Sequence, residues 1–291
     1  MKFRIEHKTT YKYSEDVSLT QNHARLTPLN LHNQTCFNTQ LIVKPTPDYT
    51  VQVRDRFANV VTVFEVPMLH NLMEVTAISE VEVISSQAHD LFAKHISWES
   101  VRNELSNPFD NDYLDALPYV IYTALTTPTQ QMIDYALLSF SPNRSIIEAC
   151  EDLMHRIYQD FSFDSHFSTI NTPLGDVFEH KKGVCQDFAH LTIACLRGLG
   201  LAARYVSGYI ETIPPPGQEK LIGADASHAW VSLFVPTIGW LDFDPTNDIQ
   251  PQEQHVVLAV GRDFSDVTPL KGVMFGGGSQ QLSVAVDMTR I

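Results

Sequence analysis

The sequence contains no long hydrophobic run and no export signal. No stretch approaches the roughly 18 consecutive apolar residues that a membrane-spanning helix needs. The first eight residues, from Met1 to Lys8, alternate charged with apolar side chains where a secretion signal has an apolar core. We therefore expect a mature chain that starts near Met1, stays in the cytoplasm and has no membrane as a partner.

Cysteine and basic residues are scarce. The 291 residues include only 4 cysteines, and their wide spacing argues against a disulfide framework and against a CxxC zinc site. Lys and Arg number 20 against 34 Asp and Glu, which gives a formal charge of −14 at pH 7. An acidic surface repels phosphate backbones, so nucleic acid is not an expected partner.

Several motifs of known chemistry are also missing. The chain has no HExxH, no GxSxG and no phosphate-binding GxxxxGK motif, and no GxGxxG follows a predicted strand. The glycine run at 276–278 lacks the Lys and Ser or Thr of a phosphate-binding loop, so it predicts a flexible turn. We expect neither a cofactor nor a metal.

The sequence does contain enough apolar residues to fill cores. Hydrophobic residues make up 44% of the chain, and its length suggests about two domains. Up to Ser85, apolar and polar residues alternate in short segments, which predicts an N-terminal antiparallel β-sandwich. The segment from Ser86 to Pro128 loses this periodicity and is predicted to be a structured connection. We place the first domain at 1–125 and the second at 126–291.

The second region mixes helices and strands, so it is predicted to be α+β. One helix is expected after Ser145, which with Glu148 has the pattern of a capping box, and another from Cys185 to Gly198, with Gly200 as its stop. The predicted strands cover 203–212, 228–235, 240–244, 256–260 and 284–288. The last two belong to a tail that could pack on either domain.

Cys185 differs from the other cysteines because it lies at the predicted start of a helix. The unpaired N–H groups and the dipole of a helix N-terminus stabilise an anion, so this position favours the thiolate that a nucleophile needs. Cys195 lies in the helix interior and is predicted to be a core residue. Helical rotation turns Asp187 and His190 away from Cys185, which predicts structural roles for both. By itself, a cysteine in an apolar helix is more often a small core residue.

A histidine and two aspartates follow in an order that a helix start and two strands can bring together. His228 opens an apolar strand, and histidine is the usual base for a cysteine nucleophile because it titrates near neutral pH. Asp242 and Asp244 lie at the end of the next strand, where a carboxylate can orient the imidazole. Period-2 alternation places both carboxylates on one strand face, so spacing does not choose between them.

These segments resemble the core motifs of the transglutaminase-like superfamily, specifically its bacterial cysteine proteases. The resemblance rests on GVCQDFAH at 183–190, RYVSGY at 204–209, SHAW at 227–230 and GWLDFDPTN at 239–247. It extends to DRFAN at 55–59, where a Gly usually precedes the Asn, and to the tail segments 260–263 and 269–273. It implies a papain- or transglutaminase-like core in which the helix bearing the cysteine packs on an antiparallel sheet.

The resemblance also implies roles for individual residues. Cys185 carries over as nucleophile, His228 as general base and acid, and Asp244, through the Asp-Pro-Thr match, as the residue that orients His228. The chemistry implied is acyl transfer from an amide through a thioester, with the oxyanion met by the backbone N–H of Cys185 and a second donor. The candidates for oxyanion or substrate binding are Gln186, Tyr158 and Trp230.

The expected activity is that of a cysteine peptidase or amidase acting on a peptide or protein. A protein-glutamine transglutaminase or deamidase is the alternative, because amine transfer and deamidation use the same residues. A non-catalytic peptide-binding module on the same fold is an alternative of another class, and metal binding through Cys185, His190 and His228 is a third. The N-terminal β domain and a surface loop predicted at 214–220 are the expected walls of the substrate cleft.

Overall fold

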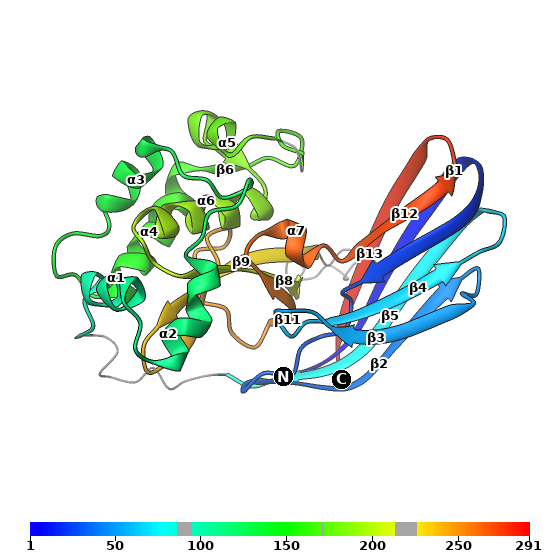
Figure 1. Cartoon of the computed structure of the whole chain (residues 1–291), viewed down its shortest axis with the longest axis horizontal. Helices are drawn as coiled ribbons and strands as arrows, with labels where there is room; N and C mark the ends of the chain where they lie inside the picture. Colours follow the sequence, from blue (N-terminus) through cyan, green and yellow to red (C-terminus); the bar gives the residue numbers. More distant parts are fainter. Residues whose placement is uncertain (86–94, 170–171, 213–225) are drawn as a thin grey trace, which may run out of the picture.

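A computed structural model of the chain describes residues 1–85, 95–169, 172–212 and 226–291. These residues form a large antiparallel sheet and, beside it, a group of helices around a smaller sheet (Figure 1). The loop predicted at 214–220 lies outside the described residues. Among the described helices, none is long and apolar enough to cross a membrane.

The large sheet is organised around the long strand β1. The strands of this sheet are β1 (Lys2–Ala24), β2 (Gln34–Lys44), β3 (Tyr49–Arg54), β4 (Val60–Val66), β5 (His70–Val83), β12 (Leu270–Gly276) and β13 (Gln280–Arg290). The first half of β1 pairs with β5 and β13, and its second half pairs with β4 and β12. Period-2 alternation buries Phe3, Ile5, His7 and Thr9 on one face of β1.

One continuous sheet replaces the two sheets of the predicted sandwich. The reason is the length of β1, which takes part in both halves and pairs irregularly with β5 between Lys12 and Val17. Buried residues from β1, β2, β4, β5 and β12 share a single core, so the sheet still encloses its own interior. The predicted fold class, α+β with an antiparallel N-terminal region, is confirmed.

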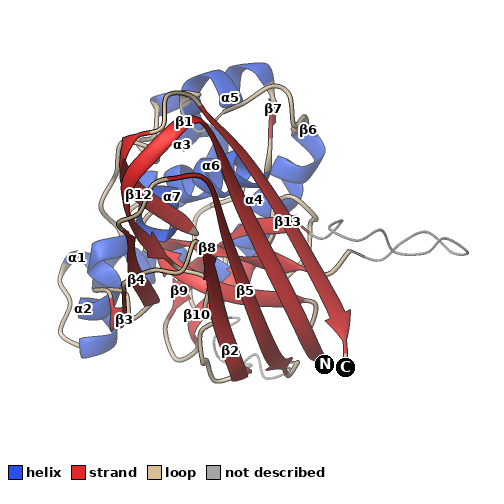
Figure 2. Cartoon of the chain, turned by 90° about the vertical axis from the view of Figure 1, so that its right-hand side faces the viewer, coloured by secondary structure: helices blue, strands red, loops and turns tan. Residues whose placement is uncertain are grey.

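The C-terminal strands return to the N-terminal sheet. Strand β13 pairs with β1 from Phe3 opposite Arg290 to Tyr13 opposite Gln280, so the two strands lie side by side (Figure 2). The sequence left open where the tail packs, and the structure places it on the first sheet. The division predicted near residue 125 therefore does not separate the two sheets, because residues 270–290 lie with the first.

The smaller sheet has the strand order β10-β9-β8-β11 and is antiparallel throughout. Its strands are β8 (Ala203–Ile210), β9 (Ala226–Val235), β10 (Gly239–Phe243) and β11 (His255–Gly261). The helices are α1 (Trp98–Ser106), α2 (Asn111–Ala116), the 3-10 turn η2 (Leu117–Tyr119), α3 (Gln130–Leu137), α4 (Ile146–Asp160), α5 (Leu174–His180), α6 (Cys185–Gly198) and α7 (Phe264–Val267). Two short parallel strands, β6 (Ser162–Phe163) and β7 (Lys182–Gly183), lead into α6.

Helix α6 packs against this sheet through its apolar face. Leu191 and Cys195 of α6 share a core with Val231 and Leu233 of β9, and all four are fully buried. The helix has the bounds that the sequence predicts, and Gly200 follows it at a φ of +80°. This packing fixes where the N-terminus of α6 lies relative to β8 and β9.

Helix α4 is present as predicted, but without its capping box. The side chain of Ser145 accepts no hydrogen bond from the first turn, and its Oγ is buried without a partner among the described residues. The cause is a β-bridge between Ser145 and Ser97, which lets the N–H of Ile146 donate to the carbonyl of Ile96 at 2.9 Å. The first N–H of the helix thus has its acceptor in the preceding backbone.

Candidate active site

Cys185 is the first residue of α6, and the turn before it is tightly held. The carboxylate of Asp187 accepts the backbone N–H of Val184 at 2.8 Å and the hydroxyl of Ser168 at 2.5 Å. Asp187 also lies against Gly183, where an added Cβ would come within 2.8 Å of the carboxylate. Asp187 therefore fixes the helix start that presents Cys185, in keeping with the structural role predicted for it.

His228 and Asp244 form a buried pair. Nε2 of His228, on β9, lies 2.7 Å from Oδ2 of Asp244, just beyond the end of β10. The other carboxylate oxygen of Asp244 accepts the backbone N–H groups of Thr246 at 3.0 Å and Asn247 at 3.3 Å. The turn after β10 therefore positions the carboxylate, and Nδ1 of His228 is left for Cys185.

The charges at this pair stabilise one another. Burial lowers the pKa of His228, but its hydrogen bonds to Asp244 and Cys185 and the charges of these two residues outweigh burial and raise the pKa to about 10. Burial also disfavours the ionised form of Asp244, yet hydrogen bonds from His228, His255 and Asn247 hold its pKa well below its usual range. An imidazolium between the carboxylate of Asp244 and the sulfur of Cys185 is the result, and it persists across neutral pH.

The structure distinguishes the two aspartates that spacing could not. Asp242 accepts the indole N–H of Trp230 at 3.0 Å and is also hydrogen-bonded to the hydroxyl of Ser232. Asp244, by contrast, faces His228. The alternation of side chains along the strand could not distinguish Asp242 from Asp244, because β10 ends at Phe243. Asp244 belongs to the following turn and not to the strand.

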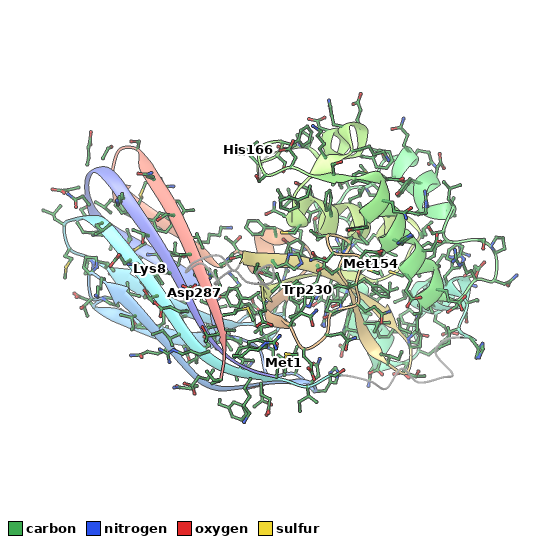
Figure 3. The ribbon with its side chains drawn as sticks, turned by 180° about the vertical axis from the view of Figure 1, so that it is seen from behind. Met1, Lys8, Met154, His166, Trp230 and Asp287 are labelled. Carbon is green, nitrogen blue, oxygen red and sulfur yellow. The ribbon has the colours of Figure 1, made fainter. Side chains whose placement is uncertain are left out.

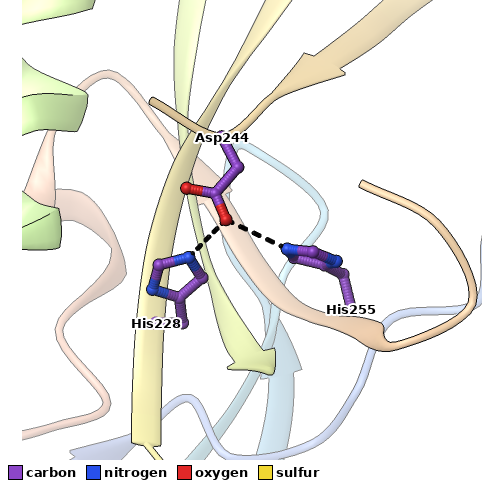
Figure 4. A group of neighbouring side chains, drawn as sticks. All are labelled: His228, Asp244 and His255. Carbon is purple, nitrogen blue, oxygen red and sulfur yellow. Dashed lines mark hydrogen bonds and ion pairs between the residues drawn. The ribbon is translucent and has the colours of Figure 1, made fainter. Parts of the chain in front are cut away.

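Two further residues contact Asp244, and sequence reasoning named neither for this site. His255, the first residue of β11, places Nε2 at 3.1 Å from Oδ2, and Asn247 places Nδ2 at 2.7 Å from it. Figure 4 shows His228 and His255 converging on the same carboxylate oxygen. The signal for His255 is a histidine opening a wholly apolar strand, the pattern that identified His228.

One cluster among the described residues has ligand atoms that all lie within 4.8 Å of one another, as a metal site requires. It consists of His228, Asp244 and His255. A metal bound by both Nε2 atoms would move the protons of both rings to Nδ1. Nδ1 of His255 is buried without a partner in the described part of the chain, whereas metal-binding histidines normally donate that N–H. The donor set therefore suits hydrogen bonding better than a metal.

His190 is not part of this cluster. Its Nε2 accepts the backbone N–H of Phe264 at 3.1 Å, and its ring packs on Tyr205 with centroids 5.0 Å apart. Burial lowers the pKa of His190 to about 4, so it stays neutral. The metal set of Cys185, His190 and His228 considered from the sequence is therefore not assembled.

The three candidate oxyanion or substrate residues lie in different surroundings. Gln186 is half-buried beside Cys185 and lines a cavity of about 260 Å³ together with Pro173 and Leu174. Tyr158 lies on the exposed face of α4, and its side chain makes no hydrogen bond or ring contact with the Cys185–His228–Asp244 group within the described ranges.

The prediction that Trp230 binds substrate or the oxyanion is wrong. Trp230 is fully buried at the junction of the two sheets (Figure 3), so it has no surface to offer a substrate. Its ring instead lies between the two histidines, with centroids 5.9 Å from His228 and 5.2 Å from His255. Sequence spacing placed Trp230 next to His228 correctly but could not show which side faces solvent.

Two of the other cysteines differ from Cys185 in their exposure. Cys150 and Cys195 are fully buried, and burial raises the pKa of Cys195 to about 12. The core position predicted for Cys195 is confirmed. Cys36 on β2 is half-buried and lies in the first sheet. Cys185 is thus the one partly exposed thiol of the helical region.

Comparisons with known proteins agree with this geometry. Residues 3–82 match the model of the bacterial transglutaminase-like N-terminal region, and residues 139–245 match that of the transglutaminase-like superfamily. The second match includes Cys185, His228 and Asp244. An uncharacterized protein of Mycobacterium tuberculosis is 37% identical over 300 residues, covering 99% of this chain and 92% of its own.

Two further relatives are informative. A protein-glutamine gamma-glutamyltransferase of Pseudomonas aeruginosa is 34% identical over 90 residues, which is 30% of this chain and 14% of the transferase. The crystal structure of a candidate cysteine protease from Cytophaga hutchinsonii aligns with a TM-score of 0.76 and 20% identity, covering 99% of this chain and 90% of that one. The latter likeness shows that the whole fold is shared.

Proposed function

Because the chain belongs to the transglutaminase-like superfamily, a family of thiol-dependent enzymes, we propose that it transfers the acyl group of amide bonds in peptides or proteins, with water as the acceptor. The observation that supports this most is His228, whose Nε2 lies 2.7 Å from Asp244 and whose pKa is raised by both Asp244 and Cys185. Such an arrangement is what a cysteine nucleophile needs, because the base must reach the thiol and be oriented by a third group.

In the first half of the reaction, the sulfur of Cys185, whose proton His228 holds, attacks the amide carbonyl carbon. The carbonyl oxygen becomes an oxyanion, which the N–H groups at the start of α6 can meet because they have no acceptor within the helix. The C–N bond then breaks, and His228 returns the proton to the departing amine. The acyl group remains on Cys185 as a thioester.

In the second half, His228 takes a proton from water while the oxygen attacks the thioester. The C–S bond breaks, a carboxylic acid leaves, and the proton returns to the Cys185–His228 pair. Asp244 remains ionised throughout and keeps the imidazole in one orientation. We propose hydrolysis as the outcome because the sequence resembles the bacterial cysteine proteases of this superfamily.

Amine transfer is the second candidate, and one observation favours it. The segment shared with the Pseudomonas aeruginosa transferase links this chain to a protein whose name states glutamine gamma-glutamyl transfer. A second amine in place of water would resolve the same thioester without any change to Cys185, His228 or Asp244. Glutamine deamidation also releases ammonia, and it differs from amine transfer in that water is the acceptor.

The test is to incubate the protein with a peptide library containing Gln, Asn and ordinary peptide bonds, with and without a primary amine. Mass spectrometry would score cleavage, ammonia release and amine incorporation. We expect the product, whichever it is, to disappear in Cys185→Ala and to persist in Cys36→Ala, which removes the half-buried thiol of the first sheet. Activity in Cys185→Ala would refute the mechanism, and binding without any product would indicate the non-catalytic peptide-binding module.

A further inference from the structure

Asp244 is held by histidines from two different strands. His228 of β9 and His255 of β11 direct Nε2 to the same carboxylate oxygen, at 2.7 and 3.1 Å (Figure 4). All three side chains are buried, and that of Asp244 is fully so. A buried carboxylate with this many donors has little freedom to turn.

The two histidines are not equivalent. An ionised carboxylate only accepts hydrogen bonds, so His255 must carry its proton on Nε2. Its Nδ1 has no hydrogen-bond partner among the described residues, and a second proton there would be a buried, unpartnered donor. His255 therefore contributes only the N–H of its Nε2, whereas His228 contributes the cation.

The surroundings of His255 hold its ring in place. The indole of Trp230 packs edge-on against it, and the N–H of that indole is fixed by Asp242. Gly208 lies opposite His228 in the sheet, where a Cβ would come within 2.5 Å of the Trp230 ring, so the absence of a side chain lets the indole lie there. The ring of His255 is thus braced by groups that do not touch Cys185.

We infer that His255 is a positioning residue, which locks the carboxylate of Asp244 so that His228 stays aligned with Cys185. The inference rests on the proposed function. It assigns to β11 a part in the site that the predicted Cys185–His228–Asp244 group does not include. The expected consequence is that removing the N–H of His255 slows the reaction of Cys185 with an electrophile, although His255 contacts Asp244 and not the thiol.

The experiment compares His255→Gln with His255→Leu. The amide nitrogen of Gln can occupy the place of Nε2 and donate, whereas Leu fills similar volume without a donor. The measurement is the rate at which iodoacetamide alkylates Cys185 at pH 6, followed by mass spectrometry of the peptide, with the half-buried thiol of Cys36 as the internal reference. No substrate is needed.

We expect His255→Leu to slow alkylation of Cys185 by roughly ten- to a hundredfold, the range that corresponds to one hydrogen bond to a charged group. His255→Gln should stay within about threefold of the wild type, and Cys36 should not change. If His255→Leu does not fold, His255→Asn replaces it, because its shorter amide reaches only the place of Nδ1.

Two results would overturn the inference. One is a wild-type rate in His255→Leu, and the other is an equal loss in His255→Gln, which would mean that the ring and not its N–H matters. Failure of the proposed function looks different, because Cys185 of the wild type would then react no faster than Cys36 at pH 6. In that case the inference falls with the function on which it rests.

Discussion

At the scale of single residues, the site is defined by the number of hydrogen-bond donors around the one carboxylate of Asp244. Side chains of His228, His255 and Asn247 converge on one oxygen, and two backbone N–H groups converge on the other. Each donor stabilises the ionised form, which is why burial does not protonate Asp244. The negative charge so fixed is what keeps His228 protonated.

The raised pKa of His228 predicts a dependence of stability on pH. Since the folded-state pKa of about 10 lies above the ordinary value of 6.5, protonated His228 stabilises the fold fully below pH 6.5, and this stabilisation is lost as the pH rises toward 10. We expect the unfolding free energy of the wild type to fall relative to His228→Gln between pH 7 and pH 10, by at most about 1.4 kcal/mol per pH unit. Urea unfolding at several pH values would measure it, and parallel curves would contradict the raised pKa.

The sequence was informative about this site where its residues lie in continuous motifs. Cys185 and His228 each begin a recognisable element, whereas spacing left Asp242 and Asp244 open and the resemblance to the transglutaminase-like superfamily chose Asp244. His255 opens an apolar strand as His228 does, but no motif linked it to the site, because its contact with Asp244 depends on β11 lying beside β8 and not on distance along the chain. The exposure of Trp230 was equally a matter of tertiary packing.

At the scale of elements, α6 shows how a buried charge can be fully satisfied. Arg197, near its C-terminus, is 1% exposed, and burial lowers its pKa to about 10. Its guanidinium donates to five acceptors, four of them backbone carbonyls. These are the carbonyls of Tyr119, Ile121, Ala203 and Arg262 and the hydroxyl of Thr126. One side chain thus joins α6 to η2, β8 and the end of β11.

Long periodic elements were predictable and short ones were not. Helices α4 and α6 lie where apolar spacing predicts them, because each buries a continuous face. Helices α1, α2, α3 and α5 have at most nine residues, too few for a periodic signal, and strand β12 lacks alternation. Their positions are set by the surfaces against which they pack.

The turn at 55–59 provides a test at the scale of one element. Ala58 has a φ of +64°, a left-handed conformation that costs an Ala more than a Gly. This is the position at which the resemblance leads one to expect Gly. We expect Ala58→Gly to raise the unfolding free energy by about 0.5–1 kcal/mol, as measured by urea denaturation.

The matched control for this turn is Ala285→Gly in the exposed part of β13. There the backbone is an ordinary strand, so the greater flexibility of Gly should lower stability by about 0.5–1 kcal/mol. Opposite signs at the two positions would support strain at Ala58. Destabilisation at both would show that the turn gains nothing from Gly.

At the scale of the whole molecule, two amide side chains of the first sheet and its connections bind the outer edge of the second. Gln34 donates to the carbonyl of Val257 and accepts its N–H, both at 2.8 Å, and Asn59 does the same for Val260, also at 2.8 Å. Strand β11 is the edge of its sheet, so these groups would otherwise lack partners. The first region therefore completes the hydrogen bonding of the strand that carries His255.

This linkage predicts that Asn59→Ala destabilises the protein although Asn59 lies far from α6 in sequence. The buried N–H and carbonyl of Val260 would lose their partners, which costs about 1–3 kcal/mol. Thermal and urea unfolding would measure the loss, with Asn38→Ala at an exposed position of β2 as the control. Equal stability of the two variants would show that water replaces the amide at β11.

The pairing of β1 with β13 has a consequence for how the protein is made. Residues 2–13 emerge from the ribosome long before residues 280–290, which form the strand that covers one side of them. During synthesis that side of β1 stays unpaired until nearly all of the described chain has appeared, and such an open edge is prone to pair with other chains. Translation that halts before residue 280 would therefore release a product prone to aggregate, so the synthesis of β13 is itself a step in assembling the sheet.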